Sequence, residues 1–222
     1  MPIQVLPPEE AYRKWAPTYE DAGALAELDE IARRRLDPLP DSPLLDAACG
    51  TGRRMRTEEG RRREGAFGID LVLPMLLAGA RGAAVAAADF RAVPFRPGSF
   101  RDAWCRLAVG HVAELGRVYA ELARALAPGG RLLVTDFHPD AARGGLTRTF
   151  RCGAEVLAVE HHVHEAGEHR SAAAGAGLAL EELLELPAGE EVRHHFAAAG
   201  KLEEWAAQRH LPVLLALRFR RA

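Results

Sequence analysis

The stretch 44–53, with the sequence LLDAACGTGR, constrains the fold of this chain more than any other. Its apolar start is typical of a buried parallel strand, and Gly50 and Gly52 supply a turn in which backbone approaches a ligand without a Cβ in the way. A strand, a glycine turn and a helix form the nucleotide-binding crevice of α/β sheets. Asp46, at the strand's carboxyl end, carries a charge that needs a polar partner.

Length and composition predict one ordinary globular domain over residues 1–222. The chain has 222 residues, an apolar fraction of 48% and a formal charge of −2, which argues against a dedicated nucleic-acid binder. Cys49, Cys105 and Cys152 are widely spaced and without a CxxC pair, as in a reducing cytoplasm. The start of the chain shows no signal pattern, and no apolar run of about 18 residues occurs. We therefore expect a cytoplasmic protein without a membrane partner.

Strands and helices alternate from residue 43 to residue 136. Further strands are predicted at 66–70, 83–88, 100–107 and 131–136, and helices at 73–80 and 112–126. This alternation predicts an α/β, doubly wound sheet with right-handed crossovers and a ligand crevice at the strands' carboxyl ends. It ends after residue 136, where we expect a hairpin of 147–150 with 155–163, a helix at 168–176, a strand at 178–186, a mostly helical segment at 190–208 broken at Gly200, and a strand at 212–220.

Two later strands also end at an acid. Asp70 lies 18 positions after Gly52, the length of one crossover helix and a turn, so it can accept the hydroxyls of a ribose or can cap the following helix. Asp89 and Phe90 follow the third strand. They can read an adenine amino group and cover its ring, or they can be a turn acid beside a core phenylalanine.

The residues before the first strand are expected to form helices over 8–36, broken near Pro17. Tyr12, Trp15 and Tyr19 can either pack this segment onto the domain or form a lid over a small molecule. Residues 53–64 are helix-compatible but almost wholly polar, so we expect a short, frayed or poorly packed helix there.

These pieces together resemble a class I S-adenosylmethionine-dependent methyltransferase of the small-molecule type, similar to the ubiquinone and menaquinone biosynthesis methyltransferases. The resemblance rests on LDAACGTG at 45–52, GID at 68–70, Asp89-Phe90 and RALAPGG at 124–130, in this order. It implies a Rossmann-like, mostly parallel seven-stranded sheet with helices on both faces, an antiparallel end formed by the last two strands and an inserted hairpin after the fifth. It divides the chain into an N-terminal helical lid (1–40), a cofactor-binding half (43–136), the hairpin (147–165) and a C-terminal half (168–222).

The resemblance also implies residue roles. S-adenosylmethionine would be the cofactor and a small molecule the methyl acceptor. The sequence leaves the oligomeric state open, with a homodimer as one option. Asp46 would lie near the cofactor's ammonium and Asp70 would hold its ribose. The remaining cofactor-binding positions would be Ala48, Cys49, Gly50, Gly52, Leu71, Asp89, Phe90 and Leu107. Ala48 stands where the commonest family pattern has glycine.

Histidines are the candidate bases, because imidazole titrates near neutral pH. His111 and His138 follow the fourth and fifth strands, so each can be a base, a substrate-positioning group or a structural residue. His161, His162 and His164 can line the substrate cavity, for which we select His162 together with the three N-terminal aromatic residues, or can lie on an ordinary hairpin surface. Sequence places no third ligand beside them, so no metal is expected.

Two other readings stay open. A cofactor-binding protein without methyl-transfer activity would share every motif. A nicotinamide-dependent oxidoreductase shares the strand, the glycine turn and the ribose acid, but it requires a full GxGxxG, which this chain lacks.

Overall fold

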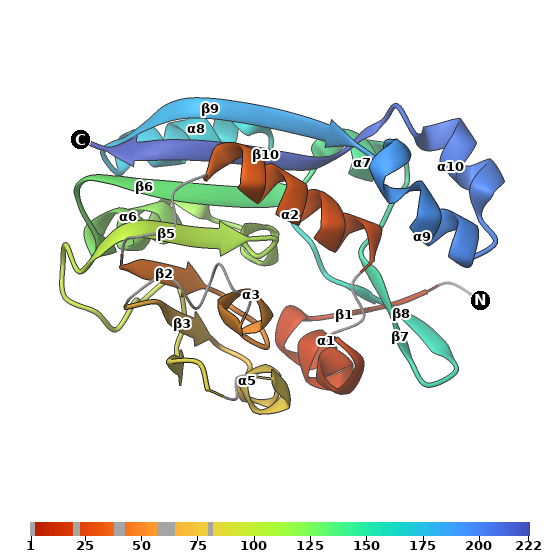
Figure 1. The fold of residues 1–222 in the computed structure, drawn as a ribbon, viewed down its shortest axis with the longest axis horizontal. Helices are drawn as coiled ribbons and strands as arrows, with labels where there is room; N and C mark the ends of the chain where they lie inside the picture. Colours follow the sequence, from red (N-terminus) through yellow and green to blue (C-terminus); the bar gives the residue numbers. More distant parts are fainter. Residues whose placement is uncertain (1–2, 20–22, 38–42, 57–64, 80–81) are drawn as a thin grey trace.

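A seven-stranded sheet runs through the centre of the computed structural model, which describes residues 3–19, 23–37, 43–56, 65–79 and 82–222 (Figure 1). The strand order is β4-β3-β2-β5-β6-β10-β9. The strands are β2 (Leu44–Ala47), β3 (Phe67–Asp70), β4 (Val85–Ala87), β5 (Phe100–Arg106), β6 (Leu126–Phe137), β9 (Leu178–Pro187) and β10 (Pro212–Arg221). This is the predicted doubly wound architecture, because the order reverses between β2 and β5.

The sheet is parallel from β4 to β6, and β10 runs antiparallel to both β6 and β9. The antiparallel last strand is thereby confirmed. Because β9 opposes β10, it runs in the same direction as β6, which corrects the expectation that both final strands are reversed. β6 also begins earlier than predicted, since Leu126 pairs with Phe100 across an irregularity in β5 and draws the Pro-Gly-Gly segment into the strand.

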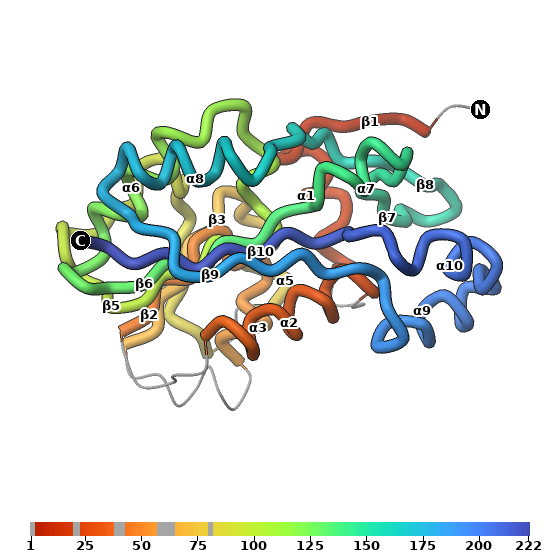
Figure 2. Tube along the Cα trace, turned by 90° about the horizontal axis from the view of Figure 1, so that it is seen from above, coloured from red at the N-terminus to blue at the C-terminus, as the bar shows by residue number. Residues whose placement is uncertain are grey.

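Helices cover both faces of this sheet, as predicted (Figure 2). On one face lie α6 (Leu115–Ala125) and α8 (Ala166–Gly175), and on the other lie α2 (Ala24–Leu36) and α3 (Arg53–Arg56). The spacing of Leu115, Val118, Tyr119 and Leu122 turns one face of α6 into the core. Of the polar segment 53–64, α3 accounts for the first turn, and 57–64 lie outside the described residues.

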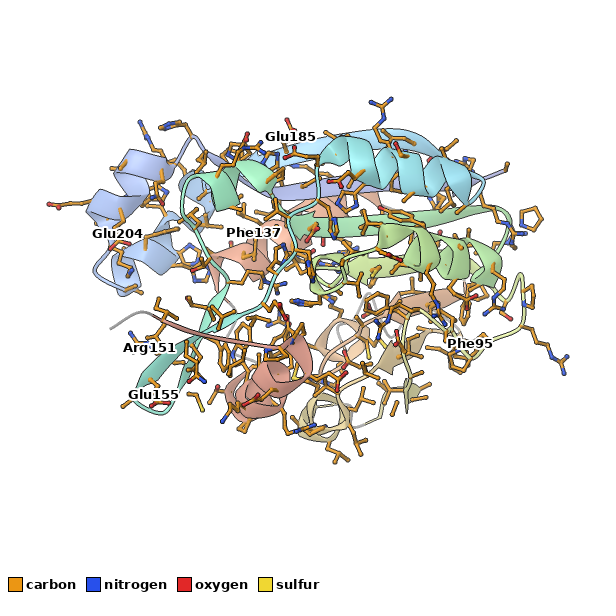
Figure 3. All side chains as sticks on the ribbon, turned by 180° about the vertical axis from the view of Figure 1, so that it is seen from behind. Phe95, Phe137, Arg151, Glu155, Glu185 and Glu204 are labelled. Atoms are coloured by element: carbon orange, nitrogen blue, oxygen red, sulfur yellow. The ribbon has the colours of Figure 1, made fainter. Side chains whose placement is uncertain are left out.

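A second, three-stranded sheet has the order β1-β8-β7. The hairpin of β7 (Thr149–Cys152) and β8 (Glu155–Val159) confirms the predicted insertion, and its tip, with Arg151 and Glu155, points away from the main sheet (Figure 3). β1 (Gln4–Leu6) pairs in parallel with β8 and was not predicted. A three-residue strand whose partner lies 153 positions away leaves no local signal.

Shorter helices complete the fold. The expected break near Pro17 separates α1 (Pro8–Trp15) and η1 (Ala16–Thr18) from α2. The others are α5 (Leu73–Gly79), η2 (Val109–His111), α7 (Pro139–Arg143), η3 (Glu190–Val192), α9 (Arg193–Ala198) and α10 (Leu202–Gln208), the last two separated at Gly200 as expected. None of the helices in the described ranges is long and apolar enough to cross a bilayer.

Candidate active site

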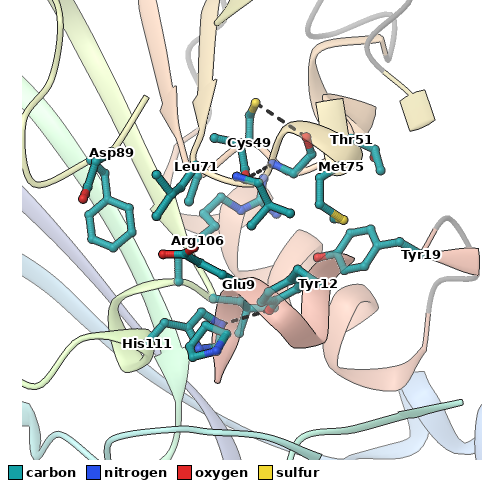
Figure 4. Close-up of a pocket in the computed structure, with 18 of the residues that line it drawn as sticks. Glu9, Tyr12, Tyr19, Cys49, Thr51, Leu71, Met75, Asp89, Arg106 and His111 are labelled. Carbon is teal, nitrogen blue, oxygen red and sulfur yellow. Dashed lines mark hydrogen bonds between the residues drawn. The ribbon is translucent and has the colours of Figure 1, made fainter. Parts of the chain in front are cut away.

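A cavity of about 440 Å³ opens where the first strands of the sheet end, and α1 and Tyr19 cover it from the opposite side (Figure 4). This volume is within the range of small-molecule sites. The lining comes from the turn after β2, the ends of β3 and β4, the β5–η2 connection and the N-terminal segment. The cavity therefore lies at the topological switch point of the sheet.

The turn after β2 forms one wall through its backbone. Ala48, Gly50 and Gly52 have φ values of 63°, 61° and 68°, a left-handed region that favours glycine. Ala48 carries a Cβ in that region, and so does Leu107, with φ 56°, across the cavity. Two strained non-glycine residues at one cavity are typical of a functional site.

Asp70 ties this turn to the end of β3. Its Oδ2 accepts the Gly50 N–H at 2.8 Å, and its Oδ1 accepts the Val72 N–H at 2.8 Å. Burial raises the pKa of Asp70 above its ordinary value, while these two hydrogen bonds act to lower it. Each carboxylate oxygen keeps a further lone pair, and Asp70 lines the cavity, so it can accept ligand hydroxyl groups.

Asp89 and Phe90 line the next part of the wall, followed by Arg91. The Arg91 guanidinium engages both oxygens of Asp89, with its Nη2 2.7 Å from Oδ2. Partial burial acts to raise the pKa of Asp89, but the hydrogen bonds from Arg91 outweigh it and the pKa lies below its usual value. A ligand amino group at Asp89 therefore meets an ionised carboxylate that is already paired.

Asp46 and Gly52 are not among the residues that line the cavity. Asp46 is fully buried behind the turn, where neither carboxylate oxygen has a hydrogen-bond partner and Nη1 of Arg54 lies 4.0 Å away. Burial raises the pKa of Asp46. The side chains of a strand alternate between the two faces, and this one points toward the α2 side of the sheet rather than into the cavity.

A buried ionic cluster around Asp29 lies on the α2 side of the sheet. Asp29, on α2, accepts hydrogen bonds from Arg106 at the end of β5 (2.7 Å), from Arg54 (3.0 Å) and from the Thr135 hydroxyl (2.6 Å). These cations hold the pKa of Asp29 below its usual range despite burial. The cluster therefore holds α2 against the sheet, behind the cavity wall. Its signal in the sequence is an acid on the apolar stripe of α2, four residues after Leu25 and three before Ala32.

The opposite end of the cavity is built from three segments far apart in the chain. His111 of η2, Tyr12 of α1 and Arg148, just before β7, form one hydrogen-bonded group. Nε2 of His111 lies 2.9 Å from the Tyr12 hydroxyl (Figure 4). The same Nε2 lies 3.1 Å from Nη1 of Arg148, which does not itself line the cavity. Arg148 also donates to the Leu107 carbonyl at 2.9 Å and to the Tyr12 hydroxyl at 3.0 Å. Nothing in the sequence singles out Arg148.

This geometry assigns the protons. Arginine can only donate, so Nε2 of His111 is the acceptor and Nδ1 carries the proton, 3.3 Å from the Glu160 carbonyl. Burial, and then the charge of Arg148, hold the pKa of His111 well below its ordinary value. Burial raises the pKa of Tyr12 to about 12. At neutral pH the site therefore presents an uncharged imidazole and an uncharged phenol.

The segment after β8 packs against the turn that carries His111 and hydrogen-bonds to it. The Glu160 carbonyl faces His111, the His162 N–H donates to the Gly110 carbonyl at 2.7 Å, and the His161 ring packs on Gly110. A Cβ on Gly110 would lie 1.9 Å from Cε1 of His161. Position 110 therefore admits only glycine while His161 keeps its place.

His161 in turn faces Asp136, which is fully buried at the end of β6. Nε2 of His161 lies 3.5 Å from Oδ1 of Asp136, and Nε2 of His169 lies 3.5 Å from Oδ2. Burial lowers the pKa of His161 to about 4. Asp136 thus lies between two histidines, His161 and His169.

The remaining predicted site residues lie outside the cavity lining. Nδ1 of His138 accepts the Asp140 N–H at 3.1 Å and so caps α7, while its Nε2 faces Glu185. Trp15 stacks on Phe150 of the hairpin, with ring centroids 4.9 Å apart. His162 contributes a backbone contact to η2 rather than a ring to the cavity. Tyr12 and Tyr19 do line it, as the lid interpretation requires.

Comparisons with known proteins agree with this architecture. Residues 45–134 match the family described as "Methyltransferase domain". Over 111 residues the chain is 36% identical to the demethylmenaquinone methyltransferase of Corynebacterium kroppenstedtii, a match that covers 49% of this chain and 47% of that protein. The chain thus spans about half the length of the curated relatives it matches.

Two solved structures extend the likeness to the whole fold. The S-adenosylmethionine-dependent methyltransferase of Mesorhizobium loti has a TM-score of 0.66 at 21% identity, over 90% of this chain and 99% of that one. The [4+2]-cyclase SpnF has a TM-score of 0.63 at 17% identity, over 100% of this chain and 99% of that one. Identities this low concern the fold alone, and the cyclase shows that the fold serves more than one reaction.

Residues 45–134 match the methyltransferase-domain family model, and the chain as a whole shares the fold of the S-adenosylmethionine-dependent methyltransferase of Mesorhizobium loti. The resemblance that the motifs indicate is therefore confirmed.

Proposed function

We propose that this chain binds S-adenosylmethionine in the 440 Å³ cavity and transfers its methyl group to a small-molecule acceptor. One observation carries the proposal: a single cavity joins the Ala48–Gly50 turn, Asp70 and Asp89 at one end to an uncharged His111 at the other. The names of the matched relatives, demethylmenaquinone methyltransferases among them, support the same class of reaction.

The residues present fit this cofactor. The Asp70 carboxylate has lone pairs for ribose hydroxyls, Phe90 offers an apolar face beside Asp89, and the turn at Gly50 lines the cavity where the methionine part would lie. A Cβ at Gly50 would lie 3.4 Å from Cε of Met75 and 3.7 Å from Tyr19, so the turn is close to neighbouring side chains but not clashing. The cofactor supplies an electrophilic methyl group on a positively charged sulfur.

His111 is the proposed catalytic residue of this chain. Its Nε2 lone pair accepts the hydrogen bond of Arg148, so a hydroxyl or amine of the acceptor has to displace that contact before His111 can take its proton as the new bond forms. A bond forming to oxygen or nitrogen makes that proton more acidic, so a weak neutral base suffices. Tyr12 and Tyr19 cover the site and exclude water, which is the lid role proposed for residues 1–40.

The proposed cellular location and partners rest on the cysteines, the cavity size and the net charge. A reducing compartment such as the cytoplasm is supported by three free cysteines, two of them buried. A small acceptor, rather than a nucleic acid or a membrane lipid surface, is supported by the size of the cavity and the near-neutral charge. The possible homodimer stays a prediction.

Isothermal titration of the full chain with S-adenosylmethionine, and separately with NAD, tests the cofactor. We expect saturable binding of the first only; binding of NAD alone would reverse the assignment. A screen of methyl acceptors with radiolabelled cofactor then tests transfer. Cofactor binding without transfer to any acceptor would favour the alternative of a binding protein or of a different reaction, as the cyclase likeness allows.

A further inference from the structure

α9 lies beside α2 (Figure 1). Between them is a second group of side chains, none of which lines the cavity. Glu27 is on α2, and His194 and His195 are in the first turn of α9. Oε2 of Glu27 lies 2.7 Å from Nε2 of His195 and 3.3 Å from Nε2 of His194. The three candidate ligand atoms all lie within 4.8 Å of one another.

The separations of 2.7 Å and 3.3 Å from Oε2 of Glu27 are close to the edges of a metal coordination shell. Two atoms bound to one ion at about 2.0–2.1 Å lie about 2.9 Å apart at a right angle and about 3.3 Å apart at a tetrahedral angle. The two imidazole rings are tilted by 35° with centroids 4.1 Å apart, and the Nε2 atoms of both face Oε2 of Glu27. Without an ion, both Nε2 atoms need a proton to hydrogen-bond to one oxygen; an ion satisfies both lone pairs and the carboxylate at once.

We propose that Glu27, His194 and His195 form a Zn²⁺ site. Two imidazoles and one carboxylate suit zinc, whereas magnesium and calcium prefer oxygen ligands alone. Elsewhere in the described part of the chain, no other three His, Cys, Asp or Glu side chains converge in this way. The denser cluster at 161–164 is unsuited, because Nε2 of His164 is hydrogen-bonded to the Val112 carbonyl at 2.8 Å.

The site joins distant parts of the chain. It links α9 in the C-terminal half to α2, which the Asp29 cluster holds against Arg106 behind the cavity wall. Glu27 and His195 also border a second cavity of about 310 Å³, which shares Arg53, Arg54 and Arg106 with the first. The ion therefore joins α9 to α2, and its remaining coordination positions are open to water. This inference does not depend on the methyl-transfer proposal.

Titration of the full chain with zinc chloride, after dialysis against EDTA, tests the site. We expect one zinc ion per chain and a rise in the thermal midpoint on zinc addition. His195→Ala, His194→Ala and Glu27→Gln should each weaken zinc binding by at least about tenfold and remove most of the thermal shift. Far-UV circular dichroism verifies that each variant is folded, and His195→Gln is the milder substitute where the alanine variant is not.

His162→Ala is the matched control, because it removes an imidazole from the other histidine cluster. It should leave zinc affinity and the thermal shift unchanged. Zinc affinity that is the same in wild type, His195→Ala and Glu27→Gln would overturn the proposal, and so would the absence of saturable zinc binding. Loss of zinc binding in the control alone would assign the ion to 161–164 and would equally overturn it.

Discussion

The two ends of the cavity are built in opposite ways. The end that holds Ala48, Gly50, Asp70 and Asp89 consists of turns that follow consecutive strands, and its main contacts are short-range in the sheet. The other end joins residues 12, 111 and 148, held by backbone at 160–162. The first end uses backbone and single acids that recur at regular spacing. The second uses side chains whose partners are up to 136 positions away.

This difference separates two kinds of sensitivity. A turn built on backbone tolerates many side-chain changes but depends on left-handed conformations and on its acids. A group of packed side chains depends on every neighbour, because each buried polar atom needs its partner. Substitutions at the turn end should therefore lower cofactor affinity, whereas substitutions at the His111 end should lower stability or change the pH profile.

Gly110→Ala should cause the largest effect, in the end built from distant segments. The added Cβ would lie 1.9 Å from the buried His161 ring, and overpacking of this kind costs about 3 kcal/mol in the free energy of unfolding. Urea denaturation measures the loss. Gly116→Ala is the matched control, because nothing lies within 4 Å of a Cβ there, and in helix α6 it should be neutral or stabilising by about 0.5–1 kcal/mol.

The double variant Gly110→Ala with His161→Ala sharpens this test, since removing the ring makes room for the methyl group. It should be more stable than the sum of the two single effects predicts. Additive single effects would show that the His161 ring does not restrict position 110.

Asp70→Ala tests the opposite end. The variant loses the proposed ribose contact and the acceptor of the Gly50 N–H, so cofactor affinity should fall by about 10-fold to 100-fold, which corresponds to about 1.5–3 kcal/mol. Titration calorimetry measures it. Asp70→Asn keeps one acceptor oxygen, so its cofactor affinity should lie between those of wild type and Asp70→Ala. Unchanged affinity in a folded Asp70→Ala variant would remove this residue from the site.

Arg148→Gln should change the pH profile more than the cofactor affinity. The folded pKa of His111 lies below its ordinary value of 6.5, so the imidazole is uncharged at neutral pH and the acid limb of the kcat profile should lie below pH 6.5. Removing the positive charge of Arg148 makes protonation easier and should move that limb upward by about one unit. Arg148→Lys keeps the charge and should leave it nearly in place; an equal shift in both variants would argue against an electrostatic role.

Ala48→Gly should have the smallest effect. A left-handed conformation costs a residue with a Cβ about 1–2 kcal/mol, while glycine loses about 0.5–1 kcal/mol more conformational entropy on folding, so a net stabilisation of about 0.5–1 kcal/mol is expected. Thermal unfolding measures it. A destabilised variant would mean that the Ala48 methyl group packs favourably enough to offset its backbone strain.

The sequence was most informative where function is encoded locally. The strand ends at Asp70 and Asp89, the glycine turn and the alternation of strands and helices all follow from patterns of 2 to 18 residues. The same reasoning grouped Tyr12, Trp15 and Tyr19, but packing separated them: Trp15 stacks on Phe150, while the two tyrosines face the cavity. It treated His111 and His138 alike, although one lines the cavity and the other caps α7.

By itself the sequence determined the fold class, the family motifs and the acids at the strand ends, because hydrophobic period and glycine turns act over neighbouring residues. Only the tertiary structure decided that Asp46 lies behind the turn, that Arg148 stands beside His111, and that Glu27 meets His194 and His195. Those positions depend on how helices and an inserted hairpin pack against the sheet, and packing joins residues that no local pattern connects.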